Sequence, residues 1–131
     1  MGSEMCIRDR LCDACFSTHL LGRWVRDKGA LTLEQAIDHL CTRPAAIFGL
    51  AGRGRLAPGC AGDVVVFDPE TVGAGPLERV HDLPAGADRL ISTPTGVRAV
   101  VVNGTVVRRD NETLLGADDP MPGHLLRRAV N

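Results

Sequence analysis

The stretch that decides the fold is GRGRLAPGCAGDVVVFDPET, residues 52–71. Its first half is rich in glycine and proline, the residues that mark turns. A short apolar run, Val64–Phe67, follows and stops at Asp68-Pro69, because proline has no N–H for a strand ladder and biases the preceding residue toward extended geometry. An apolar run between two turn signals predicts a strand that is covered on both faces.

A β-hairpin is predicted downstream, over Val97–Arg109. Asn103-Gly104 stands between two valine-rich runs. A type I′ turn requires positive φ at both central residues, and Asn-Gly is the pair that best tolerates it. Between the first strand and this hairpin, residues 68–96 contain four prolines and several glycines. That composition predicts a long irregular connection of the kind that forms a functional loop or crosses a neighbouring surface.

Upstream of the first strand, residues 11–29 predict a loop that enters a helix and ends at Gly29. The predicted buried stripe of this helix follows helical spacing. Its members are Phe16, Leu20, Trp24 and Val25.

Two more short helices are predicted before the strand. The first covers residues 32–41, with Thr32 as its N-cap and Gln35 completing a capping box. The next covers residues 42–49 and accepts Pro44 in its first turn. Three such helices are compatible either with the outer ring of a barrel or with a small helical bundle.

Composition excludes several classes of protein. With 131 residues the chain is long enough for one domain with a modest core. With a formal net charge of −1, the chain has no excess of positive charge that would indicate nucleic-acid binding. No apolar run approaches the ~18 residues of a membrane span. No secretory signal is recognisable, and five irregularly spaced cysteines predict reduced thiols. We therefore expect a cytoplasmic protein, whose oligomeric state the sequence leaves open.

Met1–Arg10 shows no periodicity. Within it, Met5–Arg10 matches an in-frame translation of a transposase adaptor end used in sequencing libraries. We expect residues 1–10 to be an assembly artefact that is disordered and packs against nothing, in which case the natural protein continues upstream. The alternative is a genuine disordered N-terminus.

The pattern R-G-x-L-x-P-G-x-x-G-D-V-V-V-F-D at residues 53–68, with P-A-x-x-F-G-L at residues 44–50 before it, carries a resemblance. It resembles the C-terminal end of amidohydrolase-superfamily enzymes, and more narrowly the branch of D-aminoacylases, or N-acyl-D-amino-acid deacylases. The valine-rich hairpin is similar to that family's tail. So is the ending with Thr113, Pro122, Gly123, Leu126 and Arg127. The resemblance covers residues 12–128, nearly the whole chain.

The resemblance implies an α+β fragment. Residues 11–50 would be the last helices of a metal-dependent (β/α)8 hydrolase barrel. Residues 51–131 would be part of a small β-sandwich with a long irregular loop and a C-terminal tail. A complete barrel needs about 250 residues, so this chain would be only its end. In the family the sandwich also takes strands from the N-terminus, so the sheet is expected to lack strands.

The resemblance also implies the hydrolysis of the amide of small-molecule N-acyl-D-amino acids with one or two Zn²⁺ ions. The family's early H-x-H, its mid-barrel ligands and its late Ser-Asp-(Ala/Gly) do not occur here. We therefore predict no catalytic residue and no metal ligand in this chain, and no activity of the chain alone. By position, Asp13, Ser17 and His19 are predicted to line the mouth of the site and contact substrate.

One group of residues could be interpreted as ligands of a metal ion. Cys12-x-x-Cys15 with His19 offers three ligands, whereas a structural zinc needs four, so ordinary helix residues are favoured over a partly filled site. Asp63, just before the first strand, is predicted to cap a turn and not to catalyse.

Two alternatives remain open. A dihydroorotase- or hydantoinase-like cyclic amidohydrolase shares the tail pattern. A stand-alone, non-catalytic α+β binding module would need a closed core of its own, whereas a fragment should leave apolar faces exposed.

Overall fold

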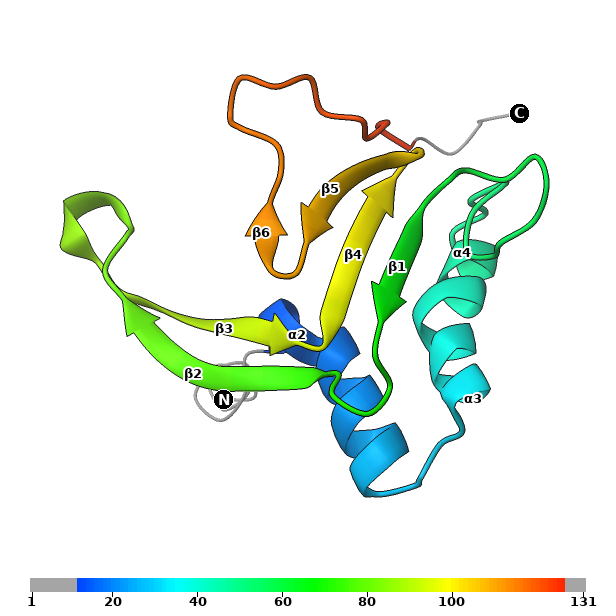
Figure 1. Cartoon of the computed structure of the whole chain (residues 1–131), viewed down its shortest axis with the longest axis horizontal. Helices are drawn as coiled ribbons and strands as arrows, with labels where there is room; N and C mark the ends of the chain where they lie inside the picture. Colours follow the sequence, from blue (N-terminus) through cyan, green and yellow to red (C-terminus); the bar gives the residue numbers. More distant parts are fainter. Residues whose placement is uncertain (1–11, 127–131) are drawn as a thin grey trace.

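The computed structural model describes residues 12–126, and the side chains from Cys15 onward (Figure 1). The prediction for residues 1–10 therefore lies outside the described residues. The helical segments are α2 (Cys12–His19), η1 (Leu20–Asp27), α3 (Leu33–Ile37), η2 (Asp38–Thr42) and α4 (Arg43–Ile47). The strands are β1 (Val64–Phe67), β2 (Gly73–Val80), β3 (Arg89–Thr95), β4 (Val97–Val102), β5 (Thr105–Arg109) and β6 (Glu112–Thr113), with a short 3₁₀ turn, η3 (Pro84–Gly86), between β2 and β3.

The strands form two separate antiparallel sheets. One has four strands in the order β1-β4-β5-β6, and the other is the β2-β3 pair. In Figure 1 the β2-β3 pair extends away from the rest of the molecule, while the helices lie below and beside the four-stranded sheet. The chain is thus a small α+β structure with antiparallel sheets, as its sequence predicts.

The predicted hairpin is present as β4 and β5. Val102 pairs with Thr105, and the two residues between them have positive φ, 46° for Asn103 and 82° for Gly104. These are the signs that a type I′ turn requires, so the local sequence signal is confirmed.

The prediction of an irregular connection over residues 68–96 is wrong. This segment contains β2 and β3, which pair from Gly73↔Thr95 to Val80↔Arg89. Prolines occur in both strands because a two-stranded sheet leaves one edge of each strand without ladder hydrogen bonds, where a missing N–H costs little. Pro76 lies at the irregularity between Ala74 and Leu77, another position that tolerates proline.

The predicted helix signals at residues 32–49 are confirmed. Thr32 Oγ1 accepts from Gln35 N at 3.2 Å, and Gln35 Oε1 accepts from Thr32 N at 2.9 Å, which is the capping box. Pro44 lies in the first turn of α4, and Gly49 beyond its end has φ +66°. The helix over 33–42 changes from α-helical in α3 to π-helical in η2.

The predicted buried stripe of the first helix is wrong in part. Phe16 is 60% exposed and Trp24 41% exposed, while Thr18 and Leu21 are buried. Around Trp24 the reason is a change of helical period, since η1 is π-helical and Lys28 N donates to Arg23 O, five residues back. Such a turn rotates the side chains away from the spacing of 3.6 residues per turn on which the prediction rests. Phe16 lies earlier, in α2, and follows Cys15, whose backbone leaves helical geometry (φ −137°, ψ 20°).

The core is small and lies where the helices meet the start of β2. Leu21, Ala36 and Val72 are its buried members. Partly buried apolar residues pack around them, namely Leu20, Val25, Leu33, Ile37, Leu40 and Phe67. A core of this size stabilises the fold only modestly. No helix within residues 12–126 is long and apolar enough to cross a membrane.

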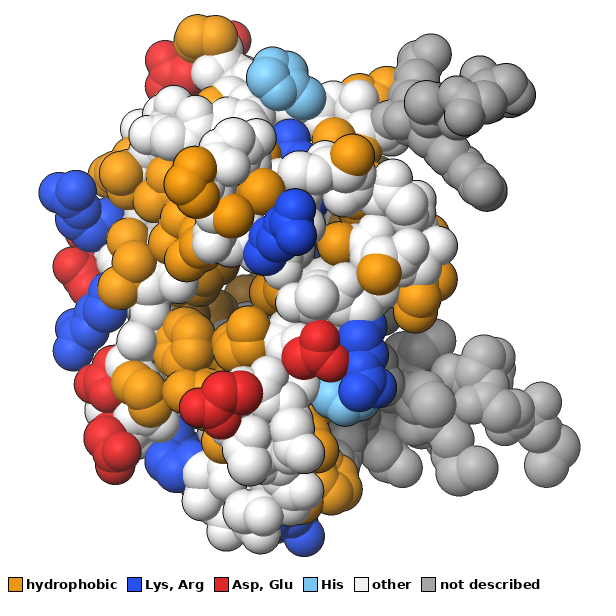
Figure 2. Space-filling view, turned by 90° about the vertical axis from the view of Figure 1, so that its right-hand side faces the viewer, with side chains coloured by type: hydrophobic (Ala, Val, Ile, Leu, Met, Phe, Trp, Pro, Cys, Tyr) orange, Lys and Arg blue, Asp and Glu red, His pale blue; other side chains and the backbone are white. Residues whose placement is uncertain are grey.

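The prediction that Val64–Phe67 is covered on both faces does not hold in this structure. β1 is an edge strand, with Val65 56% exposed and Val66 48% exposed. The sequence pattern indicates that the strand has apolar side chains on both faces. It does not indicate whether other elements are present to cover those faces. Figure 2 shows hydrophobic side chains gathered around a hollow on one face of the molecule.

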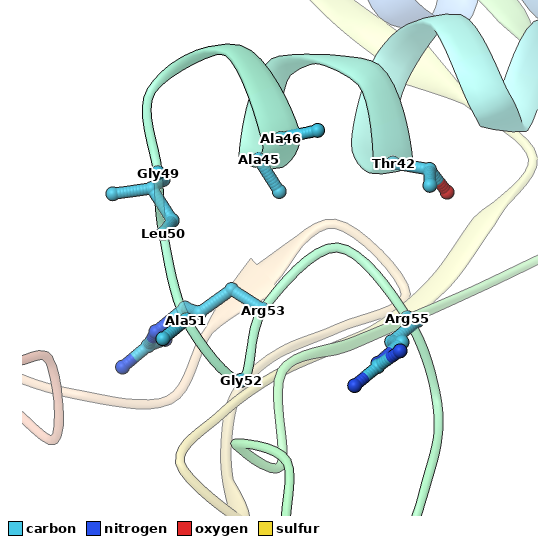
Figure 3. Close-up of a pocket in the computed structure, with 9 residues that line it drawn as sticks. All are labelled: Thr42, Ala45, Ala46, Gly49, Leu50, Ala51, Gly52, Arg53 and Arg55. Atoms are coloured by element: carbon cyan, nitrogen blue, oxygen red, sulfur yellow. The ribbon is translucent and has the colours of Figure 1, made fainter.

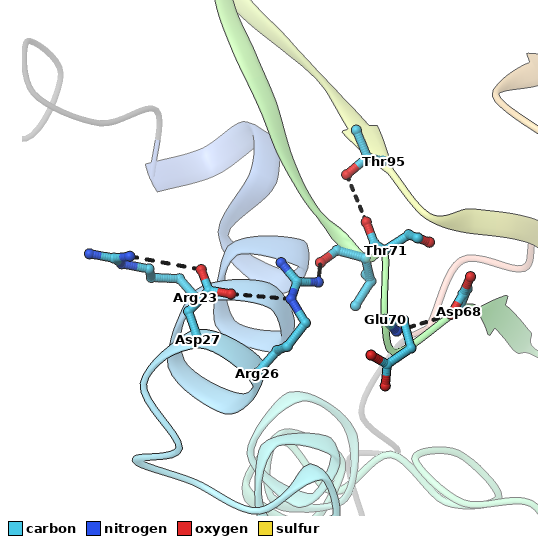
Figure 4. A network of polar contacts seen from close by, with 8 residues as sticks. Arg23, Arg26, Asp27, Asp68, Glu70, Thr71 and Thr95 are labelled. Carbon is cyan, nitrogen blue, oxygen red and sulfur yellow. Dashed lines mark hydrogen bonds and ion pairs between the residues drawn. The ribbon is translucent and has the colours of Figure 1, made fainter.

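The helices and sheets are joined at Val72, which is 1% exposed. Arg26 Nη1 donates to Val72 O at 2.6 Å. Gly22 leaves room for this carbonyl, because a Cβ on Gly22 would lie 2.5 Å from the same oxygen. Figure 4 shows how Arg26 reaches from the helix to the turn that precedes β2. Glycine and arginine together therefore set the position of the helix against β2.

The turn before Val72 is closed by Asp68. Its carboxylate accepts from Glu70 N at 3.0 Å (Figure 4). Its backbone carbonyl accepts from Val72 N at 2.8 Å. The pKa of Asp68 is held below its ordinary value of 3.8, first by the Glu70 N–H, then by the Thr71 side chain and by the charge of Arg98. The ionised form of Asp68 therefore stabilises this turn.

This interaction predicts a pH dependence of stability. Because the pKa of Asp68 is lower in the folded chain, its contribution is present above the unfolded pKa and is lost as the pH falls through the folded pKa. We expect the stability advantage of the wild type over Asp68→Asn to shrink on acidification from about pH 6 to about pH 2. Urea midpoints at a series of pH values measure it, with Glu70→Gln as the control for general charge effects. An advantage that is independent of pH would contradict the assignment.

Candidate functional site

The first predicted site residues lie along α2, which contacts β2 and β3. Cys15 is 6% exposed and its Sγ donates to Ser92 O in β3 at 3.2 Å. The backbone of Cys15 leaves helical geometry (φ −137°, ψ 20°), and its carbonyl accepts from Thr18 Oγ1 at 3.2 Å. The thiol of Cys15 is therefore part of the packing between the helix and the β2-β3 pair.

The proposed metal ligands do not form a recognisable centre in the described structure. The side chain of Cys12 lies outside the described residues, and His19 is half-buried and has an interaction partner. Among the described side chains, no group of three His, Cys, Asp or Glu residues is arranged to hold a metal ion. Cys15, Cys41 and Cys60 are free thiols.

The predicted substrate-binding residues all lie on α2. Ser17 and His19 are both half-buried. They are two positions apart, so their side chains leave the helix on different sides. The side chain of Asp13 lies outside the described part of the structure. Their assignment to the mouth of a site stays a prediction.

A polar cluster, which we call the Asp63 cluster, joins the loop before β1 to the β4-β5 turn. Asp63 Oδ1 accepts from Asn103 N at 2.9 Å, and its other oxygen forms an ion pair with Arg53. Arg53 Nη2 donates to Asn103 Oδ1 at 3.4 Å. The prediction that Asp63 caps a turn is confirmed, although the turn belongs to a hairpin 40 residues further along the chain.

The same cluster also holds the C-terminal segment. Asn103 Nδ2 donates to Pro122 O at 2.5 Å and lies 3.2 Å from His124 Nδ1. Gly104 N donates to Gly62 O at 2.9 Å. Because Arg53 is neutralised by Asp63, these groups support a structural joint and leave no free charge for chemistry. Of these three residues only Asp63 was predicted as a capping group, because no local sequence pattern indicates that Arg53 and Asn103 meet it.

The β2-β3 pair carries ion pairs near its outer end. Arg89 forms two hydrogen bonds with Asp82, at 2.7 and 2.5 Å, and Arg79 pairs with Asp88. The hydrogen bond from Arg89 holds the pKa of Asp82 below its ordinary value of 3.8. These exposed pairs fix the hairpin end and contribute little to overall stability.

Comparison with known proteins gives a family match. A model of the amidohydrolase family matches residues 8–108. The N-acyl-D-glutamate deacylase of Alcaligenes xylosoxydans xylosoxydans is 41% identical over 112 residues, which is 85% of this chain and 20% of that protein. The dihydroorotase of Lactobacillus helveticus is 43% identical over a shorter stretch of 58 residues, 44% of this chain and 13% of that protein.

Solved structures agree with the sequence comparison. A crystal structure of D-aminoacylase superposes with a TM-score of 0.58 and 34% identity, covering 75% of this chain and 19% of that one. The N-acyl-D-glutamate deacylase of Bordetella bronchiseptica, complexed with zinc and a phosphonate inhibitor, superposes with a TM-score of 0.53 and 40% identity, covering 73% and 19%. The chain therefore spans about a fifth of the length of the deacylase and D-aminoacylase relatives it matches.

Proposed function

The chain belongs to the amidohydrolase family, and from this premise we propose that it is the C-terminal part of a metal-dependent enzyme that hydrolyses the amide of N-acyl-D-amino acids. The observation that carries the proposal is the 41% identity over 112 residues to an N-acyl-D-glutamate deacylase. The products would be a carboxylate and a free D-amino acid.

The chain's own residues do not fit a zinc site. The sequence lacks the H-x-H and Ser-Asp-(Ala/Gly) motifs, and the described side chains include no cluster of three metal-ligating groups. In the proposal, the zinc ligands of the intact enzyme belong to other segments, and no chemical step is assigned to this chain.

The proposed role of this chain is structural support at the end of the enzyme. Residues 11–50 would close the (β/α)8 barrel, and residues 51–131 would form part of the β-sandwich. The exposed valines of β1 support this assignment, because large apolar side chains on a sheet edge are normally covered by neighbouring structure. Asp13, Ser17 and His19 would lie near the mouth of the site.

A chimera tests the proposed function. Residues 12–131 replace the matching segment of the Alcaligenes N-acyl-D-glutamate deacylase, and release of D-glutamate from N-acetyl-D-glutamate is measured. We expect zinc-dependent activity in the chimera and none in the same enzyme without that segment. A soluble, zinc-loaded chimera that releases no D-glutamate would count against the proposal.

A cyclic amidohydrolase is the second candidate, because a dihydroorotase is 43% identical to this chain over 58 residues. That match covers less than half of the chain, so the deacylase is favoured. Placing residues 12–131 in the Lactobacillus dihydroorotase in the same way distinguishes the two. Rescue of dihydroorotase activity, without rescue of deacylation in the first chimera, would favour the dihydroorotase-like enzyme.

A further inference from the structure

An open pocket lies between the end of the helical segment and the loop that follows it. Its volume is about 410 Å³, within the range of small-molecule sites. Ala45 and Ala46 of α4 face it from one side, and the loop from Gly49 to Arg55 borders it on the other (Figure 3). Arg53 belongs both to the lining of this pocket and to the Asp63 cluster, whereas the proposed hydrolysis assigns no role to this space.

The loop is held close against the helix, so the pocket is formed before any ligand binds. Thr42 Oγ1 donates to Gly54 O at 3.1 Å. A Cβ on Gly54 would lie 2.6 Å from the Ala45 methyl group and 2.7 Å from Cys41 O. Because only glycine permits this approach, the backbone behind the pocket is fixed by packing and not by a ligand.

The charged residues that line the pocket are both arginines, Arg53 and Arg55. No acidic residue occurs between Asp38 and Asp63 in the sequence, whereas this stretch contains three arginines. Two of the three are neutralised, Arg43 by Asp38 at 2.6 Å and Arg53 by Asp63. Arg55 is exposed, and no described residue forms an ion pair or hydrogen bond with it. Arg55 is therefore the group at this pocket that is available to bind an anion.

Most of the remaining lining is apolar, although Thr42 and Arg53 also contribute to it. Methyl groups of Ala45, Ala46 and Leu50 contribute to its lining. A ligand with a hydrocarbon part would remove such surface from water, which is favourable.

We propose that this pocket binds a monocarboxylate that carries a hydrocarbon chain. Arg55 donates hydrogen bonds to the carboxylate, and the chain lies over the alanine and leucine methyl groups. A guanidinium matches the two oxygens of a carboxylate, and charge-assisted hydrogen bonds are about twice as strong as neutral ones. The proposal depends on the pocket alone and stands whether or not the intact protein is a deacylase.

Titration of the purified 131-residue chain with sodium octanoate, followed by backbone amide NMR, tests the proposal. We expect saturable shifts confined to residues 42–56. Arg55→Gln should weaken binding about tenfold, since it removes the charge-assisted contacts from an exposed side chain without other partners. Ala46→Leu should abolish binding by filling the pocket, while leaving the rest of the spectrum unchanged. Arg109→Gln, an exposed arginine on β5, is the matched control and should bind like wild type.

Titration with uncharged 1-octanol measures how much of the binding affinity comes from apolar contacts and how much from the carboxylate charge. We expect it to bind at least tenfold more weakly than octanoate. Equal binding of octanol and octanoate, or octanoate binding that Arg55→Gln leaves unchanged, would overturn the proposal. So would shifts centred on the exposed valines of β1, because they would show non-specific contact with the open sheet.

Discussion

Replacing Gly96 by alanine is expected to lower the free energy of unfolding by about 3 kcal/mol. Gly96 connects β3 to β4 with φ +69°, a conformation that costs an L-residue about 1–2 kcal/mol. An added Cβ would also lie 2.6 Å from the Thr71 carbonyl carbon and from Val72 Cα. Both neighbours are backbone atoms at the joint between helix and sheet, so they have little freedom to move aside.

Gly29 provides the matched control for this prediction. It also has positive φ, +56°, but an added Cβ meets nothing within 4 Å. Gly29→Ala should therefore cost only the conformational part, about 1 kcal/mol. Urea unfolding followed by circular dichroism measures both variants, and the difference between them reports the contact at Val72. Equal losses for the two variants would mean that the close approach of Gly96 to Val72 does not exist in solution.

The features that sequence analysis predicted correctly are those encoded within a few residues. The capping box at Thr32 and Gln35 and the turn at Asn103-Gly104 each depend on neighbours three residues apart or fewer. Local hydrogen bonds and φ preferences decide such features, and tertiary contacts do not change them. The α+β class was predictable from these local signals and from the family resemblance of residues 53–68.

The predictions that were wrong depend on strand pairing or backbone geometry that the local residue pattern does not encode. The pairing of β2 with β3 was hidden because prolines weaken a strand signal, and only the presence of the partner strand reveals it. The buried face of the first helix was misplaced because η1 has a wider turn than the α-helix. Neither the partner nor the change of helical period can be read from the local pattern.

The same distinction holds for the candidate site. Asp63 was predicted to cap a turn because it follows a glycine-rich loop, but its partners Arg53 and Asn103 come from segments 10 and 40 residues away. The pocket beside Arg55 was not predicted at all. Its position depends on the close approach of Gly54 to the helix, which the glycine-rich sequence permits but does not specify.

The purified 131-residue chain is expected to release no D-amino acid from N-acetyl-D-glutamate or N-acetyl-D-aspartate, with or without added zinc. Metal-dependent amide hydrolysis needs an open metal position, a carboxylate that moves the proton and a pocket that excludes water. Cys12, Cys15 and His19 are close in sequence, but Cys15 is buried and its thiol donates to Ser92 O. Binding zinc there would break this contact and still leave fewer than four protein ligands.

The measurement is chiral detection of free D-amino acid, with the deacylase chimera as the active reference under the same conditions. The expected difference is therefore between a measurable rate in the chimera and the uncatalysed background in the isolated chain. Cys15→Ser is the matched variant, because it removes the candidate zinc ligand while keeping a hydrogen-bond donor for Ser92 O. Zinc-dependent release by the isolated chain that disappears in Cys15→Ser would show that the essential groups lie within these 131 residues, and the role of the chain as a non-catalytic part of the enzyme would then be wrong.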